Sequence, residues 1–250
     1  MNTALCVLIG GGLGSLCRIG LVTFPALLTT AGSASCSLPP GTGPGFVSVD
    51  ISNGRGDPYS VSGVVFSVFL DAIVHRLMPD RGPVAGGTLV KLFGRNFVDN
   101  GLTVCAIGAS GRVRARFVSP TLVVCEAPAL SYADGGDQSD RTTLWLSTTG
   151  EAGTFQPTGV SFLYQTGKTV IGTNPSVGPN DGGMDVAISG AGFTDKGPNF
   201  CRFGTTVVSA LYVDDDAMTC KSPAHDSGAV PVQVSSNGQD FTDSDVVYVF

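Results

Sequence analysis

Residues capable of chemistry are few in this sequence of 250 residues, which holds seven Cys and two His. Neither His75 nor His225 has a second His or a Cys at metal-ligand spacing. Neither stands in a context that indicates a nucleophile with its general base. We therefore interpret both as ordinary surface or loop residues. The sequence predicts a protein that is not an enzyme, with no catalytic residue, no metal site and no cofactor.

Two acidic stretches, Asp214 to Asp216 and Asp134 to Asp140, carry carboxylates that could bind calcium. Neither has the alternating acidic ligands and terminal Glu of a dedicated calcium-binding loop, so solvated turns are the favoured interpretation. Trp145, the single Trp, falls inside an expected strand. We interpret it as a core residue rather than as a platform for sugar rings.

The tripeptide Arg55-Gly56-Asp57 matches the motif that integrin receptors bind in their ligands. It lies in a polar turn directly after Asn53-Gly54. The corresponding turn, Asn237 to Asp240, is also polar, so a polar turn is expected at this place in any case. Integrin binding is the less favoured interpretation.

Charge and composition exclude two broad classes of protein. The net charge is −6, and the basic residues are scattered, so a nucleic acid is not an expected partner. The chain has 35 Gly and 15 Pro, and only 14% of its residues are charged. Gly and Pro are disfavoured inside helices, and no long stretch has helical apolar spacing. The predicted fold class is all-β.

Short phrases recur in the same order and divide the chain into repeats. Cys-x-[Ile/Phe]-Gly begins at Cys17, Cys105 and Cys201, and Cys-x-x-Pro begins at Cys36, Cys125 and Cys220. A strand with a polar turn follows in each repeat. The last two repeats keep a constant offset of 96 positions, which also relates Gly94 to Gly190.

Each repeat has the pattern of a small antiparallel sandwich. Short apolar segments, such as Leu89 to Phe93 and Leu122 to Cys125, alternate with Gly, Pro and Asp turns. Several such strands in about a hundred residues are typical of two packed sheets. We predict three modules, at residues 1–69, 70–167 and 168–250. The first of them lacks the opening strand.

The second and third repeats share a longer signature. It reads Pro-x-x-Gly-Pro-x-x-Gly-Gly, an apolar strand, Gly-x-Asn-Phe, Cys-x-[Ile/Phe]-Gly, Cys-x-x-Pro and a Ser-x-Asn-Gly hairpin. This run resembles the IPT/TIG domain, the immunoglobulin-like module of plexins, growth-factor-type receptors, fibrocystin-like surface proteins and, in divergent form, Rel-type transcription factors. The resemblance covers residues 71–250 as two whole modules and residues 1–69 as part of one. It implies tandem immunoglobulin-like β-sandwiches and leaves the function open.

The repeats pair six of the cysteines at separations of 19, 20 and 19 positions, as Cys17 with Cys36, Cys105 with Cys125, and Cys201 with Cys220. This spacing, with the resemblance to extracellular family members, indicates one disulfide per module. Because persistent disulfides need an oxidising compartment, we expect an extracellular or cell-surface protein. The alternative is three pairs of free thiols in a cytosolic protein. The seventh, Cys6, aligns with Val90 and is interpreted as a buried thiol, with an intermolecular disulfide as the less favoured alternative.

The apolar N-terminal stretch is interpreted as a core strand, Ala4 to Ile9, followed by a glycine turn. No positive residue precedes it as in a signal peptide, and Arg18 with several glycines interrupts any membrane span. Pro25 argues against a dinucleotide-binding helix after the glycines. The strand would open the module and leave a pairing edge along Leu5, Val7 and Ile9. A longer tandem array or a strand from a neighbouring protomer would cover that edge.

These observations together predict a non-catalytic, extracellular structural or adhesive protein that self-associates end to end or by strand addition into a rod or filament. The alternative is a cell-surface receptor ectodomain that binds a protein or glycan ligand. A Rel-like DNA-binding protein is disfavoured by the acidity and by the cysteine pairing. No standard N-glycosylation site is present, which leaves O-linked sugars open.

Overall fold

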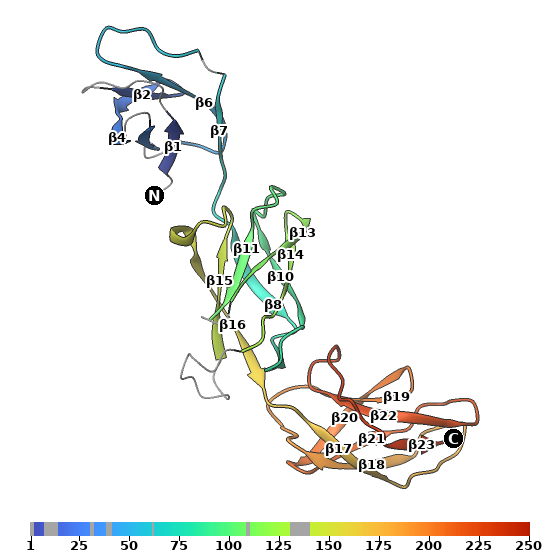
Figure 1. Ribbon diagram of the computed structural model, residues 1–250. Coiled ribbons are helices and arrows are strands. Elements are labelled where there is room, and N and C mark those ends of the chain that lie inside the picture. The colour runs from blue at the N-terminus through green and yellow to red at the C-terminus, as the bar shows by residue number, and fades with distance from the viewer. Residues whose placement is uncertain are drawn as a thin grey trace. The chain divides into compact units, whose positions relative to one another are not determined.

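The computed structural model describes residues 3–7, 15–30, 33–38, 42–61, 63–108, 111–130 and 141–250 (Figure 1). In that part of the chain, the regular structure is β-strand apart from the 3-10 helix η2, Ala152–Thr154. The all-β prediction is therefore confirmed. The chain divides into two compact units, Met1–Asp71 and Ala72–Phe250, and each is described by itself.

The first unit contains the first sandwich, which has two sheets. One sheet has the order β1-β5-β4 and the other β3-β2-β6-β7. The best-buried core residues are Cys17, Ile19, Cys36 and Val49. The strands are β1 (Thr3–Val7), β2 (Leu16–Ile19), β3 (Val22–Pro25), β4 (Leu27–Thr30), β5 (Ser33–Ser37), β6 (Gly45–Ser52) and β7 (Val65–Val68).

The second unit begins with the second sandwich, whose sheets have the orders β13-β14-β10-β8 and β12-β11-β15-β16-β9. Leu92 from one sheet and Ile107 and Phe162 from the other are fully buried between them. The strands are β8 (Ile73–Met78), β9 (Arg81–Pro83), β10 (Leu89–Arg95), β11 (Val104–Ile107), β12 (Arg112–Arg114), β13 (Arg116–Ser119), β14 (Leu122–Glu126), β15 (Arg141–Ser147) and β16 (Gln156–Gln165).

The third sandwich completes the second unit with seven strands in the order β17-β18-β21-β20-β19-β22-β23. The long strand β20 pairs with β19 through its first half and with β21 through its second, which joins the two layers. β18 alternates strictly between exposed and buried residues, as a strand with one face on the core must. The strands are β17 (Thr169–Asn174), β18 (Asp185–Ala191), β19 (Asn199–Phe203), β20 (Thr206–Asp214), β21 (Ala217–Lys221), β22 (Ala229–Ser235) and β23 (Val247–Val249).

Strand register relates the three sandwiches. Opposite the second cysteine of each lies Ala4 on β1, Val90 on β10 or Val186 on β18. The residue equivalent to Val90 is thus Ala4, and the prediction that Cys6 takes this place was wrong by two positions. A two-residue shift keeps each side chain on the same face of a strand, so the apolar pattern alone does not exclude it.

Gly94 and Gly190, related by the repeat, are required by close packing. A Cβ at Gly94 would overlap the Ile73 carbonyl oxygen and lie 2.8 Å from the Phe97 ring. At Gly190 it would overlap the Thr169 carbonyl and the Phe193 ring. The paired strands shift register at both places. Glycine therefore lets β8 approach β10 closely in the second sandwich, and β17 approach β18 closely in the third.

We predict that Gly94→Ala destabilises the second sandwich by about 1–3 kcal/mol, because the added methyl group would push away the Ile73 carbonyl and the Phe97 ring. Gly153→Ala is the matched control, since a Cβ there meets nothing within 4 Å. The free energies of unfolding come from urea titrations of the two variants and the parent protein. Equal midpoints for Gly94→Ala and Gly153→Ala would contradict the packing argument.

Candidate interaction sites

The six paired cysteines form three disulfides across the sandwiches. Cys17 is joined to Cys36, Cys105 to Cys125, and Cys201 to Cys220, with Cα–Cα distances of 6.1, 6.3 and 6.4 Å. All six residues are buried. In every sandwich the first cysteine begins the Cys-x-[Ile/Phe]-Gly phrase and lies on a strand of one layer. The second cysteine begins the Cys-x-x-Pro phrase and lies on a strand of the facing layer.

The turn Ser236 to Asp240 of the third sandwich is bound to three residues of the second, which we call the seat: Arg81, Thr88 and Leu89. The Asp240 carboxylate accepts a hydrogen bond from the Thr88 hydroxyl at 2.6 Å. Asn237 donates its amide hydrogens to the Arg81 carbonyl at 2.9 Å and to Asp240 at 2.7 Å. The Gln239 side-chain amide pairs with the backbone of Leu89. In the orientation that satisfies both of its ends, its oxygen accepts from the Leu89 N–H and its nitrogen donates to the Leu89 carbonyl. We call these contacts the joint.

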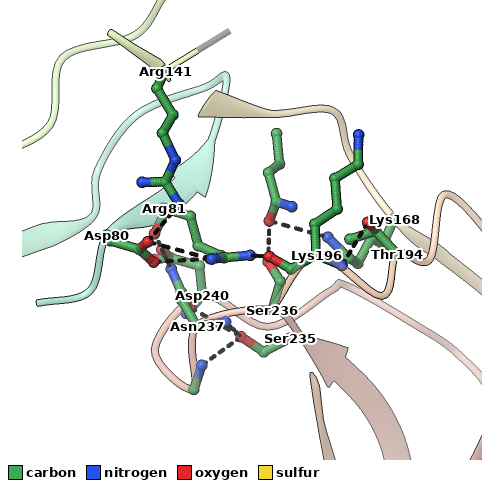
Figure 2. Close-up of polar contacts among 12 residues, drawn as sticks. Asp80, Arg81, Arg141, Lys168, Thr194, Lys196, Ser235, Ser236, Asn237 and Asp240 are labelled. Atoms are coloured by element: carbon green, nitrogen blue, oxygen red, sulfur yellow. Dashed lines mark hydrogen bonds and ion pairs between the residues drawn. The ribbon is translucent and has the colours of Figure 1, made fainter. Parts of the chain in front are cut away.

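A buried guanidinium lies at the centre of the joint. Arg81 is 5% exposed, and it donates to the Asp80 carboxylate and to the carbonyl of Lys196 in the third sandwich. Arg141 donates to Asp80 as well, as Figure 2 shows. Burial raises the pKa of Asp80, but the hydrogen bonds and charges of Arg81 and Arg141 outweigh burial and leave that pKa below its usual value. The carboxylate stays ionised, which a buried cation requires.

The segment that links the two sandwiches is held by the same joint. The side-chain oxygen of Gln165 accepts hydrogen bonds from Ser236 and from Lys168. Burial lowers the pKa of Lys168, and the nearby charge of Arg81 lowers it further. This joint was not predicted from the sequence. One signal was available, because the repeat places the uncharged Ser176 and Val177 where the second sandwich has Asp80 and Arg81, and an arginine that becomes buried needs polar partners.

Arg55, Gly56 and Asp57 are all exposed on the turn that follows β6. Beneath the turn, the hydroxyl of the buried Ser52 lies 2.8 Å from the Gly54 carbonyl oxygen and 3.1 Å from that of Asp57. The tripeptide therefore projects from a turn whose base is held by hydrogen bonds.

Strand β1 carries Leu5 and Val7 of the predicted pairing edge, whereas Ile9 lies outside the described residues. β1 pairs with β5. The equivalent strands β10 and β18 each pair on both sides, with β8 and β14 and with β17 and β21. Within the described residues β1 has no strand on its second side.

The two histidines belong to different sandwiches, His75 to the second and His225 to the third. His75 is exposed on β8, and the ring of His225 stacks on Phe250 with 4.9 Å between centroids. Nδ1 of His225 lies 2.8 Å from the Asp226 carbonyl oxygen. Among the residues that the structure describes, no group of three His, Cys, Asp or Glu side chains could hold a metal ion.

Of the two acidic stretches, Asp134 to Asp140 lies outside the described residues. In the other, the Tyr212 hydroxyl donates to Asp215 at 2.6 Å, and this hydrogen bond together with the neighbouring carboxylates raises the pKa of Tyr212 to about 12. The Asp214 carboxylate accepts from the Asp216 N–H at 2.9 Å. These carboxylates cap their own turn.

Trp145 faces outward, and the prediction that it is a core residue was wrong. Its neighbours Leu144 and Leu146 are buried, so the alternation of a strand turns Trp145 to the outer face, where it is 37% exposed. Ala106 and Pro157 lie directly across from it on the adjacent strands. An indole with one accessible face is a surface that a ligand could contact.

Across the described residues, no helix has the length and apolar character needed to span a membrane.

A search of curated proteins found no match. Among solved structures, the full extracellular region of plexin A4 is 14% identical, with a TM-score of 0.43, and the match covers 95% of this chain and 30% of that one. SGBP-B from a complex xyloglucan utilization locus in Bacteroides uniformis is 15% identical, with a TM-score of 0.28, and the match covers 72% of this chain and 49% of that one. Invasin, a bacterial integrin-binding protein, is 11% identical, covering 96% and 58%, with a TM-score of 0.27. The chain spans less than two thirds of each of these structures.

The family model of the IPT/TIG domain matches two stretches, residues 72–164 and 169–250. Together they make up more than half of the chain, and they coincide with the second and third sandwiches. The chain therefore belongs to the IPT/TIG domain family.

Proposed function

We propose that this protein is a non-catalytic, extracellular structural or adhesive protein of three modules, residues 1–69, 70–167 and 168–250, that self-associates into a rod or filament. The observation that carries the proposal is the joint, in which a hairpin turn of one sandwich holds another through hydrogen bonds and a buried guanidinium. A module that binds its neighbour in this way within the chain is suited to bind a further module from another chain.

The disulfides support the extracellular or cell-surface location. Six buried cysteines are joined in pairs across the cores. Disulfides of this kind form and persist in an oxidising environment. Each loop that they close should contribute about 3 kcal/mol to the stability of its sandwich in the chain-entropy model.

The open side of β1 supports strand addition as one mode of assembly. Unpaired N–H and C=O groups along a strand form a template for pairing with another chain. In the other two sandwiches this side is taken by β8 or β17. A strand of that kind, from an adjoining module of a longer array or from a second protein, would complete the first sandwich.

The alternative is a receptor ectodomain that binds a protein or glycan ligand, and one exposed feature favours it. The outward face of Trp145 offers a flat apolar surface to a sugar ring. This function would need no self-association.

Peptide mapping without reduction tests the compartment. We expect disulfide-linked peptides that join Cys17 to Cys36, Cys105 to Cys125 and Cys201 to Cys220, in protein taken from its natural source. Free thiols at Cys105 and Cys125 in that material would exclude an extracellular location.

Negative-stain imaging and sedimentation velocity of the full chain test self-association. We expect filaments or oligomers whose fraction grows with protein concentration. A peptide with the sequence of β17, Thr169–Asn174, should shorten them if β1 accepts a strand, whereas a scrambled peptide should not. Monomers at every concentration would count against the structural proposal and favour the receptor.

Attachment of integrin-bearing cells to the coated protein tests whether the exposed tripeptide Arg55-Gly56-Asp57 makes this chain an adhesive ligand of integrins. Adhesion through the tripeptide predicts that Asp57→Glu abolishes attachment, because the longer side chain displaces the carboxylate. The control is Asp243→Glu, a change at another exposed aspartate. Attachment that survives Asp57→Glu would remove the integrin interpretation.

A further inference from the structure

One sheet of the second sandwich gathers basic side chains that are scattered along the sequence. In this sheet, β13-β14-β10-β8, the outer side carries four of them, which we call the basic face: Arg76, Lys91, Arg95 and Arg116 (Figure 1). We infer that the basic face binds a sulfated polysaccharide. Such a site goes beyond the structural role proposed above and needs no self-association. Only the choice of a polysaccharide rests on the proposed extracellular location.

Strand alternation turns the basic face away from the core. In the chain, three of its residues are each followed by a side chain that packs in the core of the second sandwich, namely Leu77, Leu92 and Phe117. Because successive side chains of a strand point to opposite faces, the basic side chains point outward. All four are exposed.

The strand register spreads the four charges into a row. Arg116 and Lys91 lie opposite Val124, one on each side of β14. Arg76 lies on β8, two positions along the sheet from Lys91, and Arg95 lies on β10 two positions further. With strands about 4.8 Å apart and about 3.3 Å per residue, neighbouring members of the row are roughly 8–10 Å apart. A ligand that meets all four charges must therefore be an extended chain.

The sheet itself does not neutralise this row. The ion pairs among the described residues include none of the four basic residues. Glu126 is the one acidic residue of these four strands, and it lies opposite Leu89, at the end of the sheet that meets the joint. The Arg76 guanidinium is held over the Phe93 ring, 4.0 Å from its centroid. Neighbouring like charges repel, so an anion over the row would be stabilising.

The third sandwich shows that the fold does not require these charges. Its strands β17-β18-β21-β20 pair as β8-β10-β14-β13 do. By strand register, the positions that correspond to the basic face are Gly172, Ala187, Ala191 and Leu211. None of them is charged. The basic face is therefore a property of the second sandwich alone of these two, as expected of a ligand site on that module.

A sulfated polysaccharide is the anion that fits the row. Its sulfate groups are spaced along an extended chain, and the arginine fork can donate two parallel hydrogen bonds to an oxyanion. A bound peptide would need a free sheet edge or side-chain pockets, whereas the basic face lies across the flat of a sheet. The disulfides favour an extracellular polysaccharide over a nucleic acid. The net negative charge does not oppose this ligand, because the acidic excess lies in residues 168–250.

Titration of the full chain with heparin at several salt concentrations tests the site. Lys91→Gln and Arg116→Gln should each weaken heparin binding about fivefold at low salt. Each should also lower the slope of log affinity against log salt by about one, because one contact to a linear polyanion is lost. Arg116→Lys keeps the charge and should retain most of the affinity.

The matched control is Arg55→Gln, which removes an exposed arginine from the first sandwich and should leave heparin binding unchanged. Urea unfolding midpoints equal to that of the parent would show that the variants are folded. A parent chain that does not bind heparin, or Gln variants that bind it like the parent, would overturn the basic face as an anion site. Desulfated heparin or duplex DNA that binds as tightly as heparin would overturn the sulfated polysaccharide as its ligand. Any of these failures would leave the proposed self-association standing, because imaging tests it separately.

Discussion

A covalent bond across each sandwich is the constraint on which the rest of the structure depends. The disulfides join facing layers through buried cysteines, so they hold the two layers of each sandwich at a fixed spacing. In the first sandwich Cys17 and Cys36 themselves belong to the buried core. The cross-link restricts the unfolded chain, whose many glycines would otherwise give it a large conformational entropy. With the cross-link in place, the residues of the turns can be used for contacts rather than for the stability of the sandwich.

The turns use that freedom to make contacts between modules. In the joint, the hairpin turn of the third sandwich and not a sheet face contributes the polar groups, and the second sandwich contributes a buried Arg81 with its carboxylate. A buried guanidinium is costly unless every donor finds an acceptor, so the joint tolerates few alternative arrangements. Gly197 adds to this, because a side chain at that position would overlap the Arg81 guanidinium. The geometry of the joint therefore depends on a few residues at the module ends.

Much of this organisation could be predicted from the sequence, because turn glycines and cysteines recur at a constant offset and strands follow from alternation. What could not be predicted depends on contacts between segments or on register. Trp145 was placed in the core on its apolarity, although its neighbouring leucines already occupy the inner face. Cys6 was placed two positions out of register, since alternation repeats every second residue. The joint was missed because the partners of Arg81 come from more than a hundred positions away in the chain.

Among the described residues, two of the four ion pairs, Arg81–Asp80 and Arg141–Asp80, lie in the joint, whereas Arg18–Asp50 and Lys221–Asp185 each join paired strands within one sandwich. Exposed pairs add little to the stability of a fold, but they discriminate between wrong and right partners. The two pairs of the joint surround a buried guanidinium, so they favour one arrangement of the second and third sandwiches over others.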